Sequence, residues 1–306
     1  MPGRGKRVAI IDVGDQQPRR VGPDVEAGKV SPVERRSTVT RLGRGVDLSA
    51  RLSAEAIEDA CAAIEPYTER LRELGAEKVD AIATSAVRDA ANGSAFVAEL
   101  RERFALSARV LDGEEEARLT YLGATSEHSP AEPTLVVDIG GGSTELIVGT
   151  GEEISFHTSM QAGVVRHTER HIATDPPTAV ELEALATDIR GLIEAAVPPG
   201  TAAGAGIAVA GTPNSLAAID LGLDPYDPLR VQGHILTLPA IQRMLSQLAS
   251  APLVERVGIP GMHPDRAPTI VAGVVILIET MRAFDLEEIE ASEHDILYGA
   301  AIAASR

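Results

Sequence analysis

The segment Asp138-Ile-Gly-Gly-Gly-Ser-Thr-Glu145 contains three consecutive glycines and follows a strand-like apolar run, Leu135-Val136-Val137. Glycines let the backbone fold closely around a ligand, because no Cβ atom obstructs the approach. Successive N–H groups in such a turn can converge on phosphate oxygens. Asp138 ends one expected strand and Glu145 opens the next, so two carboxylates flank the turn where a divalent cation would bind. The segment therefore predicts a phosphate-binding loop between two strands.

The composition predicts a cytoplasmic protein with an aliphatic core. At 306 residues the chain is long enough for two domains. Hydrophobic residues make up 44% of the chain, whereas aromatic residues make up 3% and tryptophan is absent. The single cysteine, Cys61, rules out an intramolecular disulfide and favours a reducing compartment. Because Cys61 lies on the apolar face of an expected helix, we expect a buried structural thiol.

The charge and the apolar runs exclude two classes of partner. A formal net charge of −17 argues against binding of duplex nucleic acid, which needs a basic face. A polyanionic substrate stays open if arginines or a metal offset that charge locally, although the arginine clusters at 19–20 and 35–44 fit a solvated surface equally well. The longest apolar run, from Ile270 to Ile278, is too short to span a membrane. No signal peptide is recognised, so we expect a soluble protein.

The spacing of apolar residues predicts alternating strands and helices, and hence an α/β fold with mixed sheets. In the first half we expect strands at 7–13, 33–42, 78–84 and 109–111, and helices at 53–74, 95–104 and from about Glu114. In the second half we expect strands at 135–137, 145–148, 154–158 and 207–210, and helices at 178–195 and following residues 211–215. Pro66 should kink the first long helix.

Each half of the chain opens with a strand that ends in Asp-x-Gly. These two ends are Asp12-Val-Gly14 and Asp138-Ile-Gly140. Their recurrence predicts an internal structural repeat of low sequence identity. The polar, proline-rich segment from Glu127 to Pro133 is a candidate for the crossing between two domains.

Several motifs together resemble one protein family. Two Asp-x-Gly strand ends resemble the phosphate loops of the actin-like ATPase superfamily. Residues 112–119, Asp-Gly-Glu-Glu-Glu-Ala-Arg-Leu, resemble the Ser-Gly-x-Glu-Glu-Ala-Arg motif of the exopolyphosphatase and guanosine pentaphosphate phosphohydrolase family. Residues 83–88, Ala-Thr-Ser-Ala-Val-Arg, and residues 292–299, Ser-Glu-His-Asp-Ile-Leu-Tyr-Gly, resemble two further segments of that family. The resemblance spans nearly the whole chain and implies a short form without the C-terminal extension of larger members.

This resemblance implies the architecture and the assembly. It implies two ribonuclease-H-like α/β domains that face a central cleft. Residues 1–128 with the final helix, 296–306, would form the first domain, and residues 129–295 would form the second. The residues themselves do not indicate an oligomeric state, and only the resemblance suggests a homodimer.

The resemblance also implies an Mg²⁺-dependent exopolyphosphatase that releases orthophosphate from the end of inorganic polyphosphate. Glu116 would orient or deprotonate the attacking water, and Arg88 would hold a phosphate oxygen. Asp138 and Glu145 would bind Mg²⁺, with Asp12 as a further metal-binding candidate. The candidate phosphate-binding residues are Gly140, Gly141, Gly142, Ser143, Thr144, Gly14, Arg19, Gly211 and Thr212.

Each assignment has a simpler alternative. Glu114 and Glu115 fit the first turn of a helix, where the dipole favours acidic residues. Arg88 could form an ordinary surface ion pair. We identify no metal-ligand spacing among the histidines, including His263, and therefore expect no zinc site.

Two other functions stay open. Guanosine pentaphosphate ends in the same phosphoanhydride as polyphosphate, but the scarcity of aromatic residues leaves no clear platform for a purine. A protein that binds polyphosphate or an alarmone with little turnover is the second alternative, and an unusual first loop motivates it. A kinase fits less well, because the 112–119 motif resembles that of hydrolases.

The first loop departs from the family pattern after Gly14. Relatives typically carry hydroxyl residues there and then an apolar strand, whereas this chain has Asp-Gln-Gln-Pro-Arg-Arg-Val-Gly-Pro-Asp at 15–24. Only Arg19 matches. We expect Pro18, Gly22 and Pro23 to break the second strand, and Asp15 to oppose an approaching phosphate.

Overall fold

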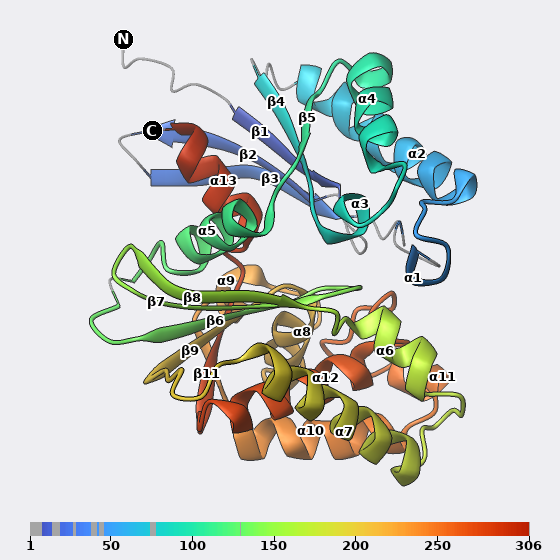
Figure 1. Ribbon diagram of the computed structural model, residues 1–306, viewed down its shortest axis with the longest axis vertical. Helices are drawn as coiled ribbons and strands as arrows, with labels where there is room; N and C mark the ends of the chain where they lie inside the picture. Colours follow the sequence, from blue (N-terminus) through green and yellow to red (C-terminus); the bar gives the residue numbers. More distant parts are fainter. Residues whose placement is uncertain are drawn as a thin grey trace. The chain divides into compact units, whose positions relative to one another are not determined.

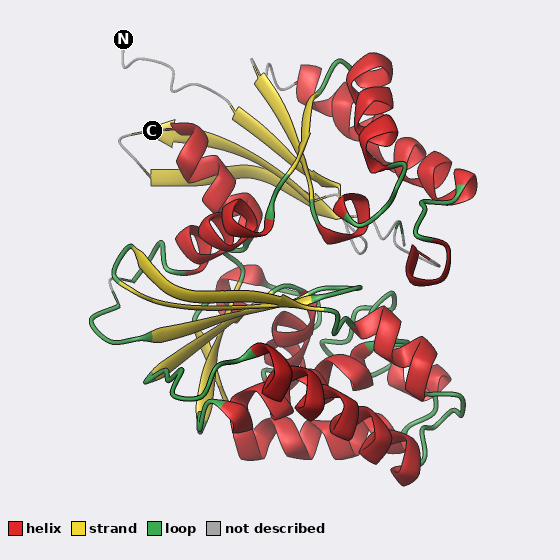
Figure 2. Cartoon of the chain, viewed as in Figure 1, coloured by secondary structure: helices red, strands yellow, loops and turns green. Residues whose placement is uncertain are grey.

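The structure, a computed structural model, describes residues 8–13, 19–26, 29–37, 42, 46–73, 78–128 and 130–305. The chain forms two compact units, Met1–Gly123 with Ile296–Arg306, and Ala124–Asp295. Each unit is built on its own β-sheet with helices packed against it (Figures 1 and 2). The predicted α/β class is confirmed.

The sheet of the first unit has five strands in the order β3-β2-β1-β4-β5. Its first three strands form an antiparallel meander, and β4 and β5 then extend the sheet in parallel with β1. The strands are β1 (Val8–Val13), β2 (Arg19–Glu26), β3 (Lys29–Ser37), β4 (Lys78–Ala83) and β5 (Ser107–Val110).

Helices cover both faces of this sheet, which explains why β1 reads as a continuous apolar run. Ala9 and Ile11 point into one core cluster with α2 (Ala54–Glu73) and α4 (Gly93–Phe104). Ile10 points to the other face, where α5 (Gly113–Ala124) and α13 (Ile296–Ser305) form a second cluster. Figure 1 shows the two helix pairs on opposite sides of the strands. The described residues of this unit also form two one-turn helices, α1 (Val46–Ser49) and α3 (Ser85–Arg88).

The expectation that Gly22 and Pro23 break the second strand is wrong. Strand β2 runs through both residues and pairs with β3 on either side of them. The register shifts between Val21 and Pro23, as in a β-bulge, which accommodates a residue without an N–H group to donate. Asp15 and Pro18 lie outside the described residues.

Helix α2 matches its sequence-based prediction closely. It continues through Pro66 and buries Ala60, Ile64 and Leu71 on one face. Cys61 is fully buried on that face, and burial raises the pKa of its thiol. The prediction of a buried structural cysteine is therefore confirmed.

The sheet of the second unit has six strands in the order β10-β11-β9-β6-β7-β8. Strands β6, β7 and β8 form an antiparallel meander, and β9 and β11 follow β6 in parallel. The strands are β6 (Thr134–Ile139), β7 (Thr144–Thr150), β8 (Glu153–Met160), β9 (Ala205–Val209), β10 (His234–Thr237) and β11 (Glu288–Ser292). Without the antiparallel edge strand β10, this is the topology of the first unit, so the internal repeat predicted from the two Asp-x-Gly ends is confirmed.

The helices of the second unit pack around one buried apolar helix, α12 (Ile270–Ala283). It contacts α7 (Ala179–Ala196) and α10 (Leu238–Ser250), and the three lie beneath the sheet in Figure 1. The remaining helices are α6 (Val164–His171), α8 (Gly211–Asp220), α9 (Pro228–Val231) and α11 (Leu253–Arg256). Among the described residues, no helix combines the length and the apolar character that a membrane span requires.

Candidate functional site

In the first unit, the start of α5 separates one buried glutamate from two accessible neighbours. The Asp112 carboxylate accepts a hydrogen bond from the Glu115 backbone N–H at 2.8 Å and so caps the helix. Glu114 is exposed and Glu115 is half-buried, whereas Glu116 is only 6% exposed. The structure therefore distinguishes Glu116 from the two acidic residues that precede it.

Arg88 holds the Glu116 carboxylate. Its Nη1 lies 2.5 Å from Glu116 Oε2 and also donates to the Leu111 carbonyl at 3.2 Å. Burial raises the pKa of Glu116, and the hydrogen bond and charge of Arg88 oppose that rise only in part. A buried carboxylate with a raised pKa and a fixed orientation is suited to accept a proton. The sequence predicted Arg88 as a phosphate ligand, and the structure adds a contact to the candidate base.

Two glycines allow the close helix packing that positions the Arg88–Glu116 pair. A Cβ at Gly93 would lie 1.9 Å from the Val87 carbonyl oxygen, so α4 can follow α3 only with glycine there. A Cβ at Gly299 would lie 1.8 Å from the Leu119 carbonyl oxygen, where α13 meets α5. Both contacts fix the helices that carry Arg88 and Glu116.

In the second unit, the glycine loop between β6 and β7 is anchored through its carbonyl groups. Gly140 O accepts from the Val164 N–H and Gly141 O from the Val165 N–H, both at 3.0 Å. Gly142 O accepts from Arg166 Nε at 2.7 Å. All three carbonyls are therefore bound by the first turn of α6.

This anchoring orients the N–H groups of the loop. The C=O and N–H of one trans peptide point in opposite directions. The carbonyls of residues 140–142 point to α6, so the N–H groups of Gly141, Gly142 and Ser143 are directed away from it. Three successive N–H groups on one side of a turn form a concave donor set for an anion.

The two carboxylates beside the loop suit a hard divalent cation. Asp138 on β6 lies directly opposite Glu145 on β7. Two like charges at such positions destabilise a sheet unless a cation compensates them. Glu145 Oε1 accepts hydrogen bonds from Ser143 Oγ at 2.7 Å and Ser159 Oγ at 2.8 Å, which orient the group. Oxygen donors of this kind are those that Mg²⁺ prefers, so the residues present fit that ion.

The hydroxyl groups of Ser143 and Thr144 donate hydrogen bonds to other groups of the protein. Ser143 donates to Glu145, and the buried Thr144 hydroxyl donates to the Ala162 carbonyl. The sequence predicted phosphate contacts from both hydroxyls and from backbone N–H groups. In the structure these two hydroxyls brace the loop, and the backbone N–H groups remain directed away from α6.

Residues 23–301 match the model of the Ppx/GppA phosphatase family. The chain belongs to this family. It is 34% identical over 314 residues to Exopolyphosphatase 2 of Mycobacterium tuberculosis, covering 97% of this chain and 98% of that relative. It is 31% identical over 283 residues to a guanosine-5'-triphosphate,3'-diphosphate pyrophosphatase of Photobacterium profundum, covering 91% of this chain and 55% of that relative. The Ppx/GppA crystal structure from Aquifex aeolicus has a TM-score of 0.84 at 29% identity, covering 98% of this chain and 97% of that one.

The match confirms the family predicted from the sequence motifs and the fold class implied by them. The family residues expected in the first loop are only partly described. Asp12 lies in β1 opposite Ile82 of β4 and is half-buried. Gly14 lies outside the described residues, and of Arg19 only the backbone, at the start of β2, is described.

Gly211 and Thr212, the remaining phosphate-binding candidates of this Ppx/GppA chain, begin α8 immediately after β9. Thr212 is only 4% exposed. A Cβ at Gly211 would lie 2.1 Å from Cζ of Arg266, so this arginine lies against the start of the helix. Arg266 is itself only 7% exposed. No sequence pattern singled it out, because the contact joins two segments that are distant along the chain.

Ala210, just before this helix, has a strained backbone. Its φ of 75° and ψ of −166° fall in a region that is essentially reserved for glycine. We expect Ala210→Gly to stabilise the protein by about 1 kcal/mol, since relief of strain exceeds the entropy cost of glycine. Urea unfolding of both proteins measures this difference. A less stable variant would show that the alanine carries no such strain.

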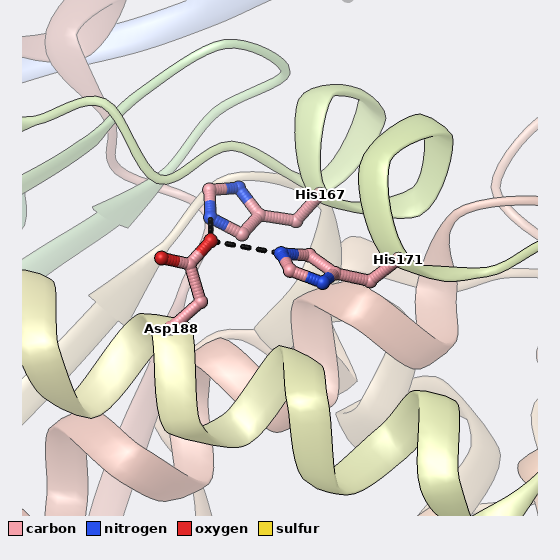
Figure 3. A group of neighbouring side chains, drawn as sticks. All are labelled: His167, His171 and Asp188. Carbon is pink, nitrogen blue, oxygen red and sulfur yellow. Dashed lines mark hydrogen bonds and ion pairs between the residues drawn. The ribbon is translucent and has the colours of Figure 1, made fainter.

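One further cluster was missed at the sequence level. His167 and His171 lie one turn apart on α6 and face Asp188 on α7 (Figure 3). The prediction that the histidines lack metal-ligand spacing is therefore wrong, because an i, i+4 pair places two imidazoles on one helix face. Burial lowers the pKa of His167 to about 4. Partial burial acts to raise the pKa of Asp188, but hydrogen bonds from His171 and Arg170 hold it below its usual value.

Proposed function

We propose that the chain is an exopolyphosphatase, a phosphoanhydride hydrolase that removes the terminal phosphate of inorganic polyphosphate as orthophosphate. The glycine loop carries this proposal, because three N–H groups on one side of the turn stand beside the opposed carboxylates Asp138 and Glu145. The full-length similarity to Exopolyphosphatase 2 supports polyphosphate as the substrate.

Phosphoryl transfer to water needs a positioned phosphate, neutralised charge and an oriented nucleophile. The N–H groups of Gly141, Gly142 and Ser143 would bind oxygens of the terminal phosphate. Mg²⁺ held by Asp138 and Glu145 would neutralise phosphate charge when bound, and Asp12 of the first unit is a separate metal-binding candidate. Gly140 and Thr144 would shape the loop. Gly14, Arg19, Gly211 and Thr212 would serve as further phosphate contacts.

Glu116 would act as the general base. As the water oxygen bonds to the terminal phosphorus, its proton passes to the Glu116 carboxylate, and the bridging P–O bond to the shortened chain breaks. Arg88 would orient that carboxylate and hold a phosphate oxygen. These roles follow from the family resemblance and from the burial and pairing of Glu116 within its own unit.

Hydrolysis of guanosine pentaphosphate is the second candidate. The similarity to the Photobacterium profundum relative favours it, although the chain spans only 55% of that protein.

The cytoplasmic location, the homodimer and the domain limits at 128, 129 and 295 expected from the sequence remain proposals.

Phosphate release from the two substrates tests the proposal. We expect purified protein to release orthophosphate from long-chain polyphosphate in the presence of Mg²⁺, and chelation of the metal to abolish that release. Faster release from guanosine pentaphosphate than from polyphosphate would favour the second candidate. Folded protein that is inactive on both, but melts at a higher temperature with polyphosphate, would instead indicate a binding protein.

A further inference from the structure

A cluster of two histidines and one aspartate joins α6 to α7 in the second unit (Figure 3). His171 Nε2 lies 2.8 Å from Asp188 Oδ2, and His167 Nε2 lies 3.5 Å from the same oxygen. One ligand atom from each of the three residues lies within 4.8 Å of the other two. The two imidazole rings are stacked, with centroids 5.7 Å apart. Three donor atoms of different residues therefore converge on one point.

The environment of His167 identifies its protonated nitrogen. His167 is fully buried, and its Nδ1 lies 3.2 Å from the Gly163 carbonyl oxygen. Because a carbonyl can only accept, Nδ1 carries the hydrogen and Nε2 presents a lone pair. That Nε2 has no hydrogen-bond partner among the residues that the structure describes. A buried lone pair thus faces a carboxylate oxygen, an arrangement that a cation between the two would stabilise.

We propose that His167 Nε2, His171 Nε2 and Asp188 Oδ2 bind a divalent transition-metal ion of the zinc class. Two imidazole nitrogens and one carboxylate oxygen are donors that zinc accepts, whereas Mg²⁺ prefers oxygen donors throughout. Metal–ligand bonds of zinc sites place neighbouring tetrahedral donors about 3.3 Å apart. The separations of 2.8 and 3.5 Å lie on either side of that distance, so small side-chain movements suffice. The Gly163 carbonyl supplies the outer contact that fixes a ligating histidine.

One neighbouring cation competes for the carboxylate. Arg170 Nη1 lies 3.2 Å from Asp188 Oδ2, and its side chain is 47% exposed. Such an exposed ion pair contributes little free energy, so the guanidinium can turn to solvent when a metal binds. Three protein ligands would then leave a fourth position for water.

The place of the cluster gives it a consequence for the glycine loop. The first turn of α6 binds the carbonyls of that loop, and the later turns carry His167 and His171. A metal that joins these histidines to Asp188 would fix α6 against α7 and so restrain the support of the loop.

Metal titration of the full chain tests the site. Protein without an affinity tag is titrated with Zn²⁺, and with Co²⁺ as a spectroscopic probe, in excess Mg²⁺ that occupies oxygen-donor sites. We expect one bound Zn²⁺ per chain, visible absorption bands of Co²⁺–imidazole coordination, and a higher melting temperature with Zn²⁺. In His171→Gln and Asp188→Asn we expect affinity to fall by at least about tenfold.

The matched control is His234→Gln. His234 Nε2 lies 2.8 Å from Asp220 Oδ2, as in the proposed site, but no second histidine of the described residues joins that pair. This variant should bind Zn²⁺ like the original protein. Circular dichroism shows whether each variant is folded. The proposal is overturned if the original protein binds no Zn²⁺ in excess Mg²⁺, or if the folded His171→Gln and Asp188→Asn variants bind it with unchanged affinity.

Discussion

Glu116→Gln should lower the rate of phosphate release from polyphosphate by about 10²- to 10⁴-fold, the usual contribution of a positioned general base. Glutamine keeps the size of the side chain but cannot accept a proton from water. Glu114→Gln is the matched control, because Glu114 lies in the same helical turn and is exposed. Initial rates of orthophosphate release by the three proteins measure the effect. A folded Glu116→Gln variant with the original rate would exclude Glu116 as the base.

The pH dependence of the rate provides an independent check. Glu116 must be ionised to accept a proton, and burial raises its pKa. The rate should therefore fall as the pH decreases through this raised pKa, and the Glu116→Gln variant should lose that dependence.

The contribution of Glu116 to the stability of the protein should change with pH in the opposite sense to the rate, because it falls as the pH rises. A carboxyl group with a raised folded-state pKa stabilises the protein below its unfolded-state pKa, and this contribution is lost as the pH rises through the folded-state value. Above that value the ionised Glu116 makes no such contribution, and its replacement should leave the protein folded.

Gly163→Ala should destabilise the protein by about 1–3 kcal/mol, as overpacked substitutions do, and should also reduce phosphate release. A Cβ at this position would lie 2.1 Å from the Gly141 carbonyl oxygen, so the glycine loop and the start of α6 must separate. That separation would weaken the hydrogen bonds that hold the loop carbonyls, and with them the direction of the N–H groups.

Gly191→Ala is the control for this prediction. Gly191 lies within α7, and a Cβ there would meet no heavy atom of the described residues within 4 Å apart from the backbone of its own helix. Alanine favours a helix by up to about 1 kcal/mol over glycine, so this variant should be more stable than the original protein with an unchanged rate. Denaturant unfolding and phosphate release, measured on both variants, decide the matter. Equal stability of the two variants would mean that Gly163 is not required for the close contact.

The sequence predicted those features that depend on local pattern. The continuous apolar run of β1 and the glycines at 140–142 each carry their own signal, because periodicity and glycine content are local properties. The helix expected at 178–195 is found at Ala179–Ala196, where Thr178 and Glu181 form a capping box. Glu116 was separated from Glu114 and Glu115 only by its place in a family motif, and burial now distinguishes it physically.

Other features depend on contacts that no local pattern encodes. The continuation of β2 through Pro23 rests on pairing with β3, and a strand partner can override a weak local preference. The contact of Gly163 with Gly141 and that of Arg266 with Gly211 join distant segments. The strain at Ala210 is likewise imposed by the surrounding structure, since alanine does not favour that conformation.

The anchoring of residues 140–142 by α6 has a consequence for how substrate preference could change. Residues 140–142 are all glycine, so the conformation of the loop depends on the hydrogen bonds that α6 makes to its carbonyl groups. Substitutions in residues 163–166 would redirect the N–H groups that we propose to bind phosphate. Variants with altered chain-length preference should therefore be sought at the start of α6, the helix that binds the loop carbonyls.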